Sequence, residues 1–200
     1  VGFSDVLASG GSSEEDQRNY FRIIQSNSDL LLRLINDILD LSRLEANKVI
    51  LTPEDCDVVQ LCRQALSSVE MSRRESGNRF VFETKTDSFV LQTDIQRLQQ
   101  VLINLLTNAA KFTKNGTITL QFEVEKEKNR VLFAVADTGC GIPKEKQKQV
   151  FERFEKLNEY AQGTGLGLSI CKLTVDKWGG DIWIDPDYEG GARFVVSHPL

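Results

Sequence analysis

The chain has 200 residues, 40% of them hydrophobic and 26% charged, a balance typical of a globular protein. Its 24 Lys and Arg residues against 29 Asp and Glu residues give a formal net charge of −5. This composition gives no basic character that would favour nucleic acid or an anionic membrane surface as a partner.

The four cysteines show neither CxxC spacing nor a suitable histidine partner for zinc, which indicates free thiols in a reducing compartment. No apolar run approaches the roughly 20 residues of a membrane span, and no signal-peptide pattern is present. We therefore expect a cytoplasmic location without membrane contact. A longer parent chain anchored in the inner or plasma membrane stays open.

The first 47 residues predict a helical hairpin. The opening "VGFSDVLASGG" has the pattern of a helix that ends at the Gly10-Gly11 bend, and Ser12 with Glu15 forms a capping-box signal for a second helix. The second helix carries a heptad seam and extra leucines that widen it. So broad an apolar face favours self-association in a bundle over the alternative, a helix folded onto its own domain. The seam is Phe21, Ile24, Ser28, Leu31, Ile35, Ile38, Ser42 and Glu45, and the extra leucines are Leu30, Leu34, Leu41 and Leu44.

Residues 48–200 predict one α+β domain. A short strand and turn around Pro53 precede a helix over 57–74, and the stretch 79–91 alternates as strands do. Thr93 with Gln96 would cap a helix that ends at Phe112, and a hairpin over 116–137 follows, with "KEKN" at its tip. A helix over 166–178 and a second hairpin over 179–200 complete the pattern. We expect an α/β sandwich in which helices cover one face of a mixed, mostly antiparallel sheet.

Three polar residues share a stripe on the helix that ends at Phe112. Asn104, Asn108 and Lys111 lie about a third of a turn from its apolar stripe. Asparagine is a poor helix former, so two on one face suggest a specific role. An amide oxygen can bind Mg²⁺, and an ammonium group can contact phosphate. A solvated polar face is the alternative.

Two glycine-rich stretches follow. "VLFAVADTGCGIP" ends a buried strand in Asp137, whose carboxylate can accept a ligand's hydrogen bond while Gly139 and Gly141 let the backbone pass close by. "GTGLGLSI" places Gly163, Gly165 and Gly167 at the start of an apolar helix, where free amides favour phosphate. It matches neither a P-loop nor GxGxxG.

In this order, "NLLTNAAKFT", "DTGCGIP", "FERFEK" and "GTGLGLSI" resemble the N, G1, F and G2 boxes of sensor histidine kinases. "LINDILDLSRLEANKV" also resembles the second helix of their dimerisation and histidine-phosphotransfer hairpin. The resemblance covers nearly the whole chain. It implies the Bergerat (GHKL) ATP-binding fold over 48–200 and a partial hairpin over 1–47, with ATP and Mg²⁺ as cofactors.

The resemblance also implies a role for each matching residue. Asn108 would hold Mg²⁺, Asn104 would line the phosphate site, and Lys111 would contact the phosphates; Asn104 and Lys111 are the catalytic candidates. Asp137 would accept from the adenine amino group. The adenine pocket would further include Phe112, Gly139, Gly141 and Ile142. Residues 151–162 would form the ATP lid, in which Arg153 and Lys156 would meet the γ-phosphate or the other domain. The lid hinge would be Gly163, Thr164, Gly165, Leu166 and Gly167.

Such kinases phosphorylate a histidine on the first hairpin helix and pass the phosphoryl group to an aspartate of a response-regulator receiver domain. The one histidine, His198, lies in the last predicted strand and does not match the acceptor motif. We expect the acceptor about three helical turns before Val1, so this stretch would bind ATP as a homodimer without phosphorylating itself. A nucleotide-sensing module that never transfers phosphate is the alternative. A GHKL ATPase is disfavoured, because such enzymes carry a glutamate base where this chain has Asn104.

Overall fold

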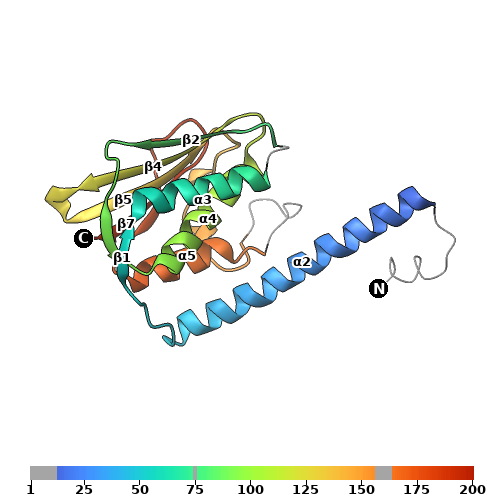
Figure 1. Ribbon diagram of the computed structural model, residues 1–200, viewed down its shortest axis with the longest axis horizontal. Coiled ribbons are helices and arrows are strands. Elements are labelled where there is room, and N and C mark those ends of the chain that lie inside the picture. The colour runs from blue at the N-terminus through green and yellow to red at the C-terminus, as the bar shows by residue number, and fades with distance from the viewer. Residues whose placement is uncertain (1–12, 74–75, 156–163) are drawn as a thin grey trace.

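The computed structural model describes residues 13–73, 76–155 and 164–200. It begins with one long helix, α2 (Glu14–Glu45), whose N-terminal half extends away from the rest of the molecule (Figure 1). Ser13 is the N-cap, and its hydroxyl oxygen accepts from the Asp16 amide. The predicted cap was therefore one residue early. The acidic first turn suits the positive end of the helix dipole.

The remaining elements form one α+β body, as predicted. Short 3₁₀ turns among the described residues include Lys126–Lys128, Lys144–Lys146 and Gln149–Phe151. The helices are α3 (Val58–Ser72), α4 (Ile95–Phe112) and α5 (Gly167–Lys177). The strands are β1 (Glu54–Asp57), β2 (Arg79–Thr84), β3 (Val90–Thr93), β4 (Thr117–Glu125), β5 (Arg130–Asp137), β6 (Ile182–Ile184) and β7 (Arg193–Pro199).

The main sheet has five strands in the order β2-β4-β5-β7-β6. Only the β2–β4 pair is parallel, so the sheet is mixed and mostly antiparallel. Helices α3, α4 and α5 lie against one face of it (Figure 1). The apolar stripe of α4 is fully buried there, in one cluster with the inward residues of β4 and β5. That cluster includes Leu98, Leu102, Leu105, Ile118, Leu120 and Phe133.

The alternating stretch 79–91 contains strands, as predicted, and they belong to different sheets, because β3 pairs with β1 in a separate two-stranded sheet. One local expectation was wrong. Helix α4 is capped by Asp94, whose carboxylate accepts from the Arg97 amide, while Thr93 is the last residue of β3. A carboxylate at this position also favours the helix dipole, so the cap shifts by one residue.

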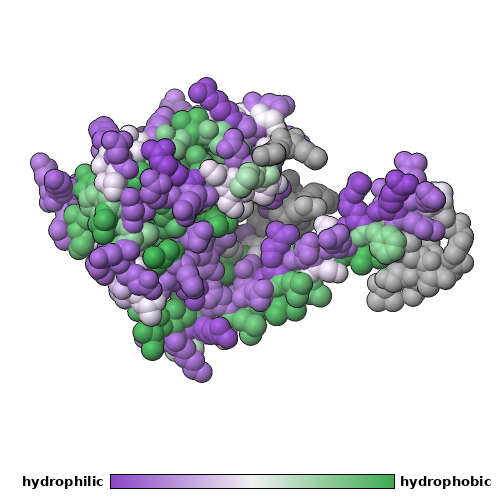
Figure 2. Space-filling model, in the orientation of Figure 1, coloured by the Kyte–Doolittle hydropathy of each residue, from purple (hydrophilic) through white to green (hydrophobic). Residues whose placement is uncertain are grey.

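The broad apolar face of α2 divides into two. Leu41 and Leu44 are buried in a cluster with Leu166 and Ile170 of the body. Most seam residues are exposed instead, with Phe21 at 61% and Leu31 at 59% of their full accessibility, and Ile24 is half-buried. Figure 2 shows apolar residues along the side of α2 that faces away from the body. One stripe thus packs on its own domain, as the second alternative expects, and the other stays uncovered by the described residues; self-association stays a prediction.

In the part of the chain that the structure describes, no helix is long and apolar enough to cross a membrane.

Candidate functional site

A cavity of about 620 Å³ opens between α4, α5, the segment after β5, and α2. Helix α4 runs along it from Asn104 to Phe112, about 12 Å at 1.5 Å per residue. We call the region around Asp137 and Phe112 the Asp137 end, and the region around Asn104 and the start of α5 the α5 end. Ten predicted site residues line the cavity: Asn104, Asn108, Lys111, Phe112, Asp137, Gly141, Ile142, Thr164, Gly165 and Gly167.

Asp137 is the best-defined group of the Asp137 end. It is the last residue of β5 and is 4% exposed. Its Oδ1 accepts from the backbone amides of Gly139 at 2.8 Å and Ala192 at 3.3 Å. No described residue donates to Oδ2, so this oxygen is left to accept from a ligand. Burial raises the pKa of Asp137 above its ordinary value, and the two backbone donors oppose that shift.

The backbone around Asp137 is crowded, which explains the glycines. A Cβ on Gly139 would lie 2.4 Å from the Phe112 carbonyl oxygen, and one on Gly191 would lie 2.3 Å from the Asp137 carbonyl oxygen. The Tyr188 hydroxyl donates to that same carbonyl at 3.1 Å. Gly141 has φ +69°, a conformation that side chains other than glycine's rarely allow. The loop between β6 and β7 thus closes over the end of β5.

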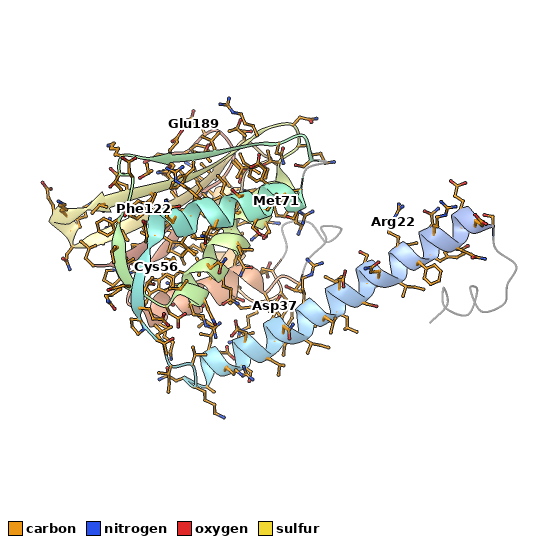
Figure 3. All side chains as sticks on the ribbon, viewed as in Figure 1. Arg22, Asp37, Cys56, Met71, Phe122 and Glu189 are labelled. Atoms are coloured by element: carbon orange, nitrogen blue, oxygen red, sulfur yellow. The ribbon has the colours of Figure 1, made fainter. Side chains whose placement is uncertain are left out.

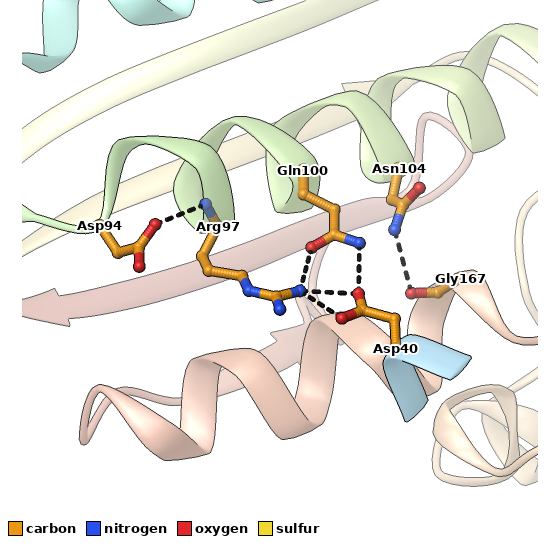
Figure 4. Close-up of polar contacts among 6 residues, drawn as sticks. All are labelled: Asp40, Asp94, Arg97, Gln100, Asn104 and Gly167. Atoms are coloured by element: carbon orange, nitrogen blue, oxygen red, sulfur yellow. Dashed lines mark hydrogen bonds and ion pairs between the residues drawn. The ribbon is translucent and has the colours of Figure 1, made fainter. Parts of the chain in front are cut away.

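At the α5 end, the asparagines of α4 face the start of α5. Asn104 donates to the Gly167 carbonyl at 3.4 Å, which ties α4 to the first turn of α5 (Figure 4). Asn108 and Lys111 line the cavity one and two turns further along α4. The Lys111 ammonium lies 4.7 Å from the centroid of the Phe112 ring. The polar stripe is therefore a cavity wall and not a solvated outer face.

The glycine-rich segment supplies backbone and one hydroxyl. The Leu166 amide donates to the Thr164 hydroxyl at 3.3 Å, and Thr164 donates to Asp37 of α2 at 2.8 Å. A Cβ on Gly165, which has φ +73°, would lie 2.9 Å from the Phe154 Cα. Leu166 is fully buried between α5 and α2 and does not line the cavity. Its part in the site is to seat the first turn of α5.

Two other predicted residues, Gly139 and Arg153, do not line the cavity, and two more cannot be placed. Gly139 lies behind Asp137 and shapes the wall without lining it. Arg153 forms an ion pair with Glu45, a predicted seam residue of α2, so its guanidinium contacts the hairpin helix. Lys156 and Gly163 lie outside the described residues, as does most of the predicted lid.

Sequence reasoning missed the wall that α2 contributes. Figure 3 places Asp37 on the side of α2 that faces the body. The available signal was the pair of acids in "LINDILDLSR", at positions 37 and 40, which interrupts the apolar face of α2. The residues that the motifs did not predict include Ser26, Asn27, Leu30, Arg33, Asp37, Ser72, Arg73, Cys140, Ala192 and Phe194.

The described residues contain no group of three or more His, Cys, Asp or Glu that could hold a metal ion by itself. An amide oxygen such as that of Asn108 is a suitable single ligand for Mg²⁺, which usually takes its other ligands from phosphates and water. The α5 end therefore fits a metal that arrives with a phosphorylated ligand, and not a metal centre built from the protein alone.

Comparisons with known proteins agree with this geometry. Residues 93–200 match the family of histidine kinase-, DNA gyrase B- and HSP90-like ATPases, and residues 1–47 match the His kinase A (phospho-acceptor) domain. The circadian input-output histidine kinase CikA of Synechococcus elongatus is 38% identical over the whole chain, which spans 27% of that relative. The sensor histidine kinase WalK of Bacillus subtilis is 30% identical over 98% of the chain and 33% of the relative.

Solved structures agree as well. Full-length ShkA in complex with AMPPNP superposes with a TM-score of 0.81 at 31% identity, over 94% of this chain and 39% of that one. The histidine kinase ThkA in complex with the response regulator TrrA gives 0.78 at 28% identity, over 99% of this chain and 55% of that one. The fold of α2 and the body is thus the fold that these kinases share. The chain belongs to the sensor histidine kinases, with the Bergerat ATPase fold that they share with DNA gyrase B and HSP90.

Proposed function

We propose that this chain binds ATP with Mg²⁺ in the cavity and is the ATP-binding portion of a sensor histidine kinase. The γ-phosphate would pass to a histidine that precedes Val1, for relay to a response-regulator aspartate. The observation that carries the proposal is the Asp137 carboxylate, buried and with one oxygen left for a ligand, in the same cavity as the polar stripe of α4. The boundary between hairpin and ATP-binding domain would lie near residue 47.

At the Asp137 end, the chain would recognise adenine. Oδ2 of Asp137 can accept from the exocyclic amino group, because Oδ1 is already occupied by two backbone donors. Phe112 and Ile142 line the same region and supply apolar surface for the ring. Guanine presents an oxygen where adenine presents its amino group, so the carboxylate would also reject guanine nucleotides.

At the α5 end, the chain would hold the phosphates. The amides at the start of α5 favour an anion there, and the Lys111 ammonium, which lies nearer Phe112 in the same cavity, would contact the phosphates from the other side. Asn108 would offer one oxygen ligand to Mg²⁺, which would neutralise phosphate charge when bound. Asn104 would hold the first turn of α5 in place through the Gly167 carbonyl. The contribution of the protein would be orientation and charge neutralisation.

His198 is a poor candidate for the phosphate acceptor. It is 6% exposed in β7, and its ring lies 5.0 Å from that of Trp178. Burial lowers its pKa below the ordinary value. A buried imidazole within a sheet cannot approach a phosphoryl group in the cavity, so the acceptor would be the histidine of the phospho-acceptor domain.

The partners follow from the hairpin helix. The exposed apolar stripe of α2, which includes Leu31, Ile35 and Ile38, would pair with a second copy of the chain in a helical bundle. ThkA, a relative of similar fold, has been solved with its response regulator. We infer a receiver domain as the second partner of this chain.

Two other functions remain as candidates. A nucleotide-sensing module would bind ATP without any transfer, and phosphorylation of a longer chain that includes the upstream histidine would exclude it. A GHKL ATPase would release phosphate steadily. Asn104 disfavours this activity, because an amide cannot act as a general base. The Asn104 side-chain nitrogen also donates a hydrogen bond to the Gly167 carbonyl.

Titration calorimetry with Mg-ATP tests the proposal. We expect binding by the chain, and a strong loss of affinity in Asn108→Ala and in Asp137→Ala. Asn36→Ala is the matched control, because Asn36 is an exposed asparagine of α2 that does not line the cavity. Undiminished binding in both site variants would contradict the assignment. Radiolabelled ATP should leave no phosphohistidine on the chain itself.

A further inference from the structure

The α5 end contains a carboxylate that the motifs do not explain. Asp37 of α2 lines the cavity, and its Oδ2 accepts from the Thr164 hydroxyl at 2.8 Å. Thr164 in turn accepts from the Leu166 amide, at the residue that precedes α5. Two residues 127 positions apart in the chain are thus joined at the start of α5.

The rest of α2 fixes Asp37 at this position. Leu41 and Leu44 pack in the cluster with Leu166 and Ile170. One turn after Asp37, Asp40 pairs with Arg97 of α4 at 2.7 Å and also accepts from Gln100 (Figure 4). These contacts keep the Asp37 backbone beside the cavity for as long as α2 is docked on the body.

A carboxylate is an unusual occupant of this end. The backbone amides at the start of α5 favour an anionic ligand, and a phosphate oxygen and a carboxylate oxygen are the same kind of acceptor for Thr164. Burial and the neighbouring Asp40 raise the pKa of Asp37, while Thr164 and Arg33 lower it. The net effect is a raised pKa, and a second anion beside the Asp37 carboxylate would meet like-charge repulsion.

We propose that Asp37 competes with the terminal phosphate of the nucleotide for Thr164 and the start of α5. The arrangement with α2 docked on the body then disfavours ATP relative to ADP, and ATP in turn favours release of α2. Because coupling between two sites is reciprocal, the same interaction free energy governs both effects. This inference rests on the proposed function, since it needs a nucleotide in the cavity.

The first test is the ratio of the Mg-ATP and Mg-ADP dissociation constants, measured by calorimetry. Asp37→Asn keeps an oxygen acceptor for Thr164 and removes the charge. We expect it to raise ATP affinity about five- to tenfold and to leave ADP affinity within about twofold, a coupling of ordinary size for two linked sites. Asp29→Asn is the matched control, because Asp29 is an exposed acid of the same helix that does not line the cavity.

A second variant keeps the test decisive if Asp37→Asn fails to fold. Asp40→Asn loosens the contact of α2 with Arg97 and leaves the cavity wall unchanged. It should shift the ATP to ADP ratio in the same direction by a smaller factor. Hydrogen exchange in residues 37–45 should be faster with ATP than with ADP in the wild-type chain, and this difference should shrink in Asp37→Asn.

The outcomes separate this inference from the proposed function. If the wild-type chain binds neither nucleotide, the proposed function fails and the inference falls with it. If it binds both, and Asp37→Asn leaves the ratio unchanged or weakens both nucleotides equally, only the competition is overturned.

Discussion

The two ends of the cavity are built in different ways. At the Asp137 end, the carboxylate is held by backbone amides of the same body, and the loop between β6 and β7 closes over it. At the α5 end, the wall combines α4, the start of α5 and α2, and one of its hydroxyls is bonded to the hairpin helix. The first end is complete within the body, whereas the second depends on where α2 lies.

This difference assigns separate tasks to the two ends. The Asp137 carboxylate is already held in position, so little conformational entropy is lost when the base binds. Base recognition should therefore not depend on the position of α2. At the α5 end, the cavity wall is shared between α2 and the body, so the position of α2 can change the affinity for the phosphate end of the nucleotide. We therefore expect changes at the Asp137 end to alter which nucleotide binds, and changes at the α5 end to alter how binding depends on α2.

The largest effect should come from Asp137→Asn. The amides of Gly139 and Ala192 select an oxygen at the Oδ1 position, so the new amide nitrogen must occupy the Oδ2 position and present donors to adenine. Loss of a hydrogen bond to a charged group costs about 1.5–3 kcal/mol, so ATP affinity should fall about ten- to 150-fold. Calorimetry with ATP and GTP should show that the preference for ATP is lost. An equal loss of affinity for ATP and GTP would mean that Asp137 does not distinguish adenine from guanine.

A pair of glycine substitutions compares the ends directly. Gly139→Ala would place a Cβ 2.4 Å from the Phe112 carbonyl oxygen, whereas one on Gly167 meets only Asn104, at an ordinary 3.7 Å. Overpacking costs about 1–3 kcal/mol of folding stability, and relief of this clash would displace Phe112 or Asp137, so Gly139→Ala should lower the thermal stability and also weaken ATP binding. Gly167→Ala should change it less than about threefold, within the scatter of a tolerated substitution. Calorimetric binding isotherms of the two variants test this expectation. A greater loss of ATP affinity in Gly167→Ala would show that the phosphates need a residue without a side chain at position 167.

How much of this could be read from the sequence depends on the distance between the contributing residues. The helical repeat of 3.6 residues put Asn108 and Lys111 on one face, and the resemblance to sensor histidine kinases made that face a predicted binding site. A buried strand that ends in an acid followed by glycines made Asp137 a candidate, and the family resemblance gave it the adenine-binding role. The mixed sheet followed from the order of hairpins and helices.

The contacts between distant segments could not be predicted in this way. Asp37 and Thr164 lie 127 residues apart, and no periodicity within α2 says which of its stripes faces the body. Tyr188, 51 residues from Asp137 in the sequence, donates a hydrogen bond to the Asp137 carbonyl from a loop whose sequence indicated only a turn. Such contacts depend on how elements pack, which local propensity does not specify.

A smaller effect should appear as a pH dependence. Because burial raises the pKa of Asp137, lowering the pH protonates its carboxyl before an ordinary aspartate, and the protonated Oδ2 becomes a donor. ATP affinity should then decrease as pH falls through this raised pKa. The stability contribution has the opposite sign: it is present below the pKa and is lost as pH rises through it, since a buried charge then forms. On acidification, the ATP affinity of the wild type measured by calorimetry should fall, whereas protonation of Asp137 should add to its stability in thermal unfolding. The Asp137→Asn variant should show neither contribution.

The smallest effect should come from Tyr188→Phe. The Tyr188 hydroxyl donates to the Asp137 carbonyl at 3.1 Å, so its loss removes one support of the residue without changing the cavity wall. A net hydrogen bond is worth about 0.5–1.5 kcal/mol, so ATP affinity should fall about two- to tenfold. If Tyr188 positions Asp137, GTP binding should fall less than ATP binding, and the ATP to GTP preference should narrow; general destabilisation would weaken both alike. Tyr20→Phe on α2, outside the cavity wall, should leave both nucleotides unchanged. An unaltered ATP to GTP ratio in Tyr188→Phe would mean that the two backbone amides alone hold the carboxylate in place.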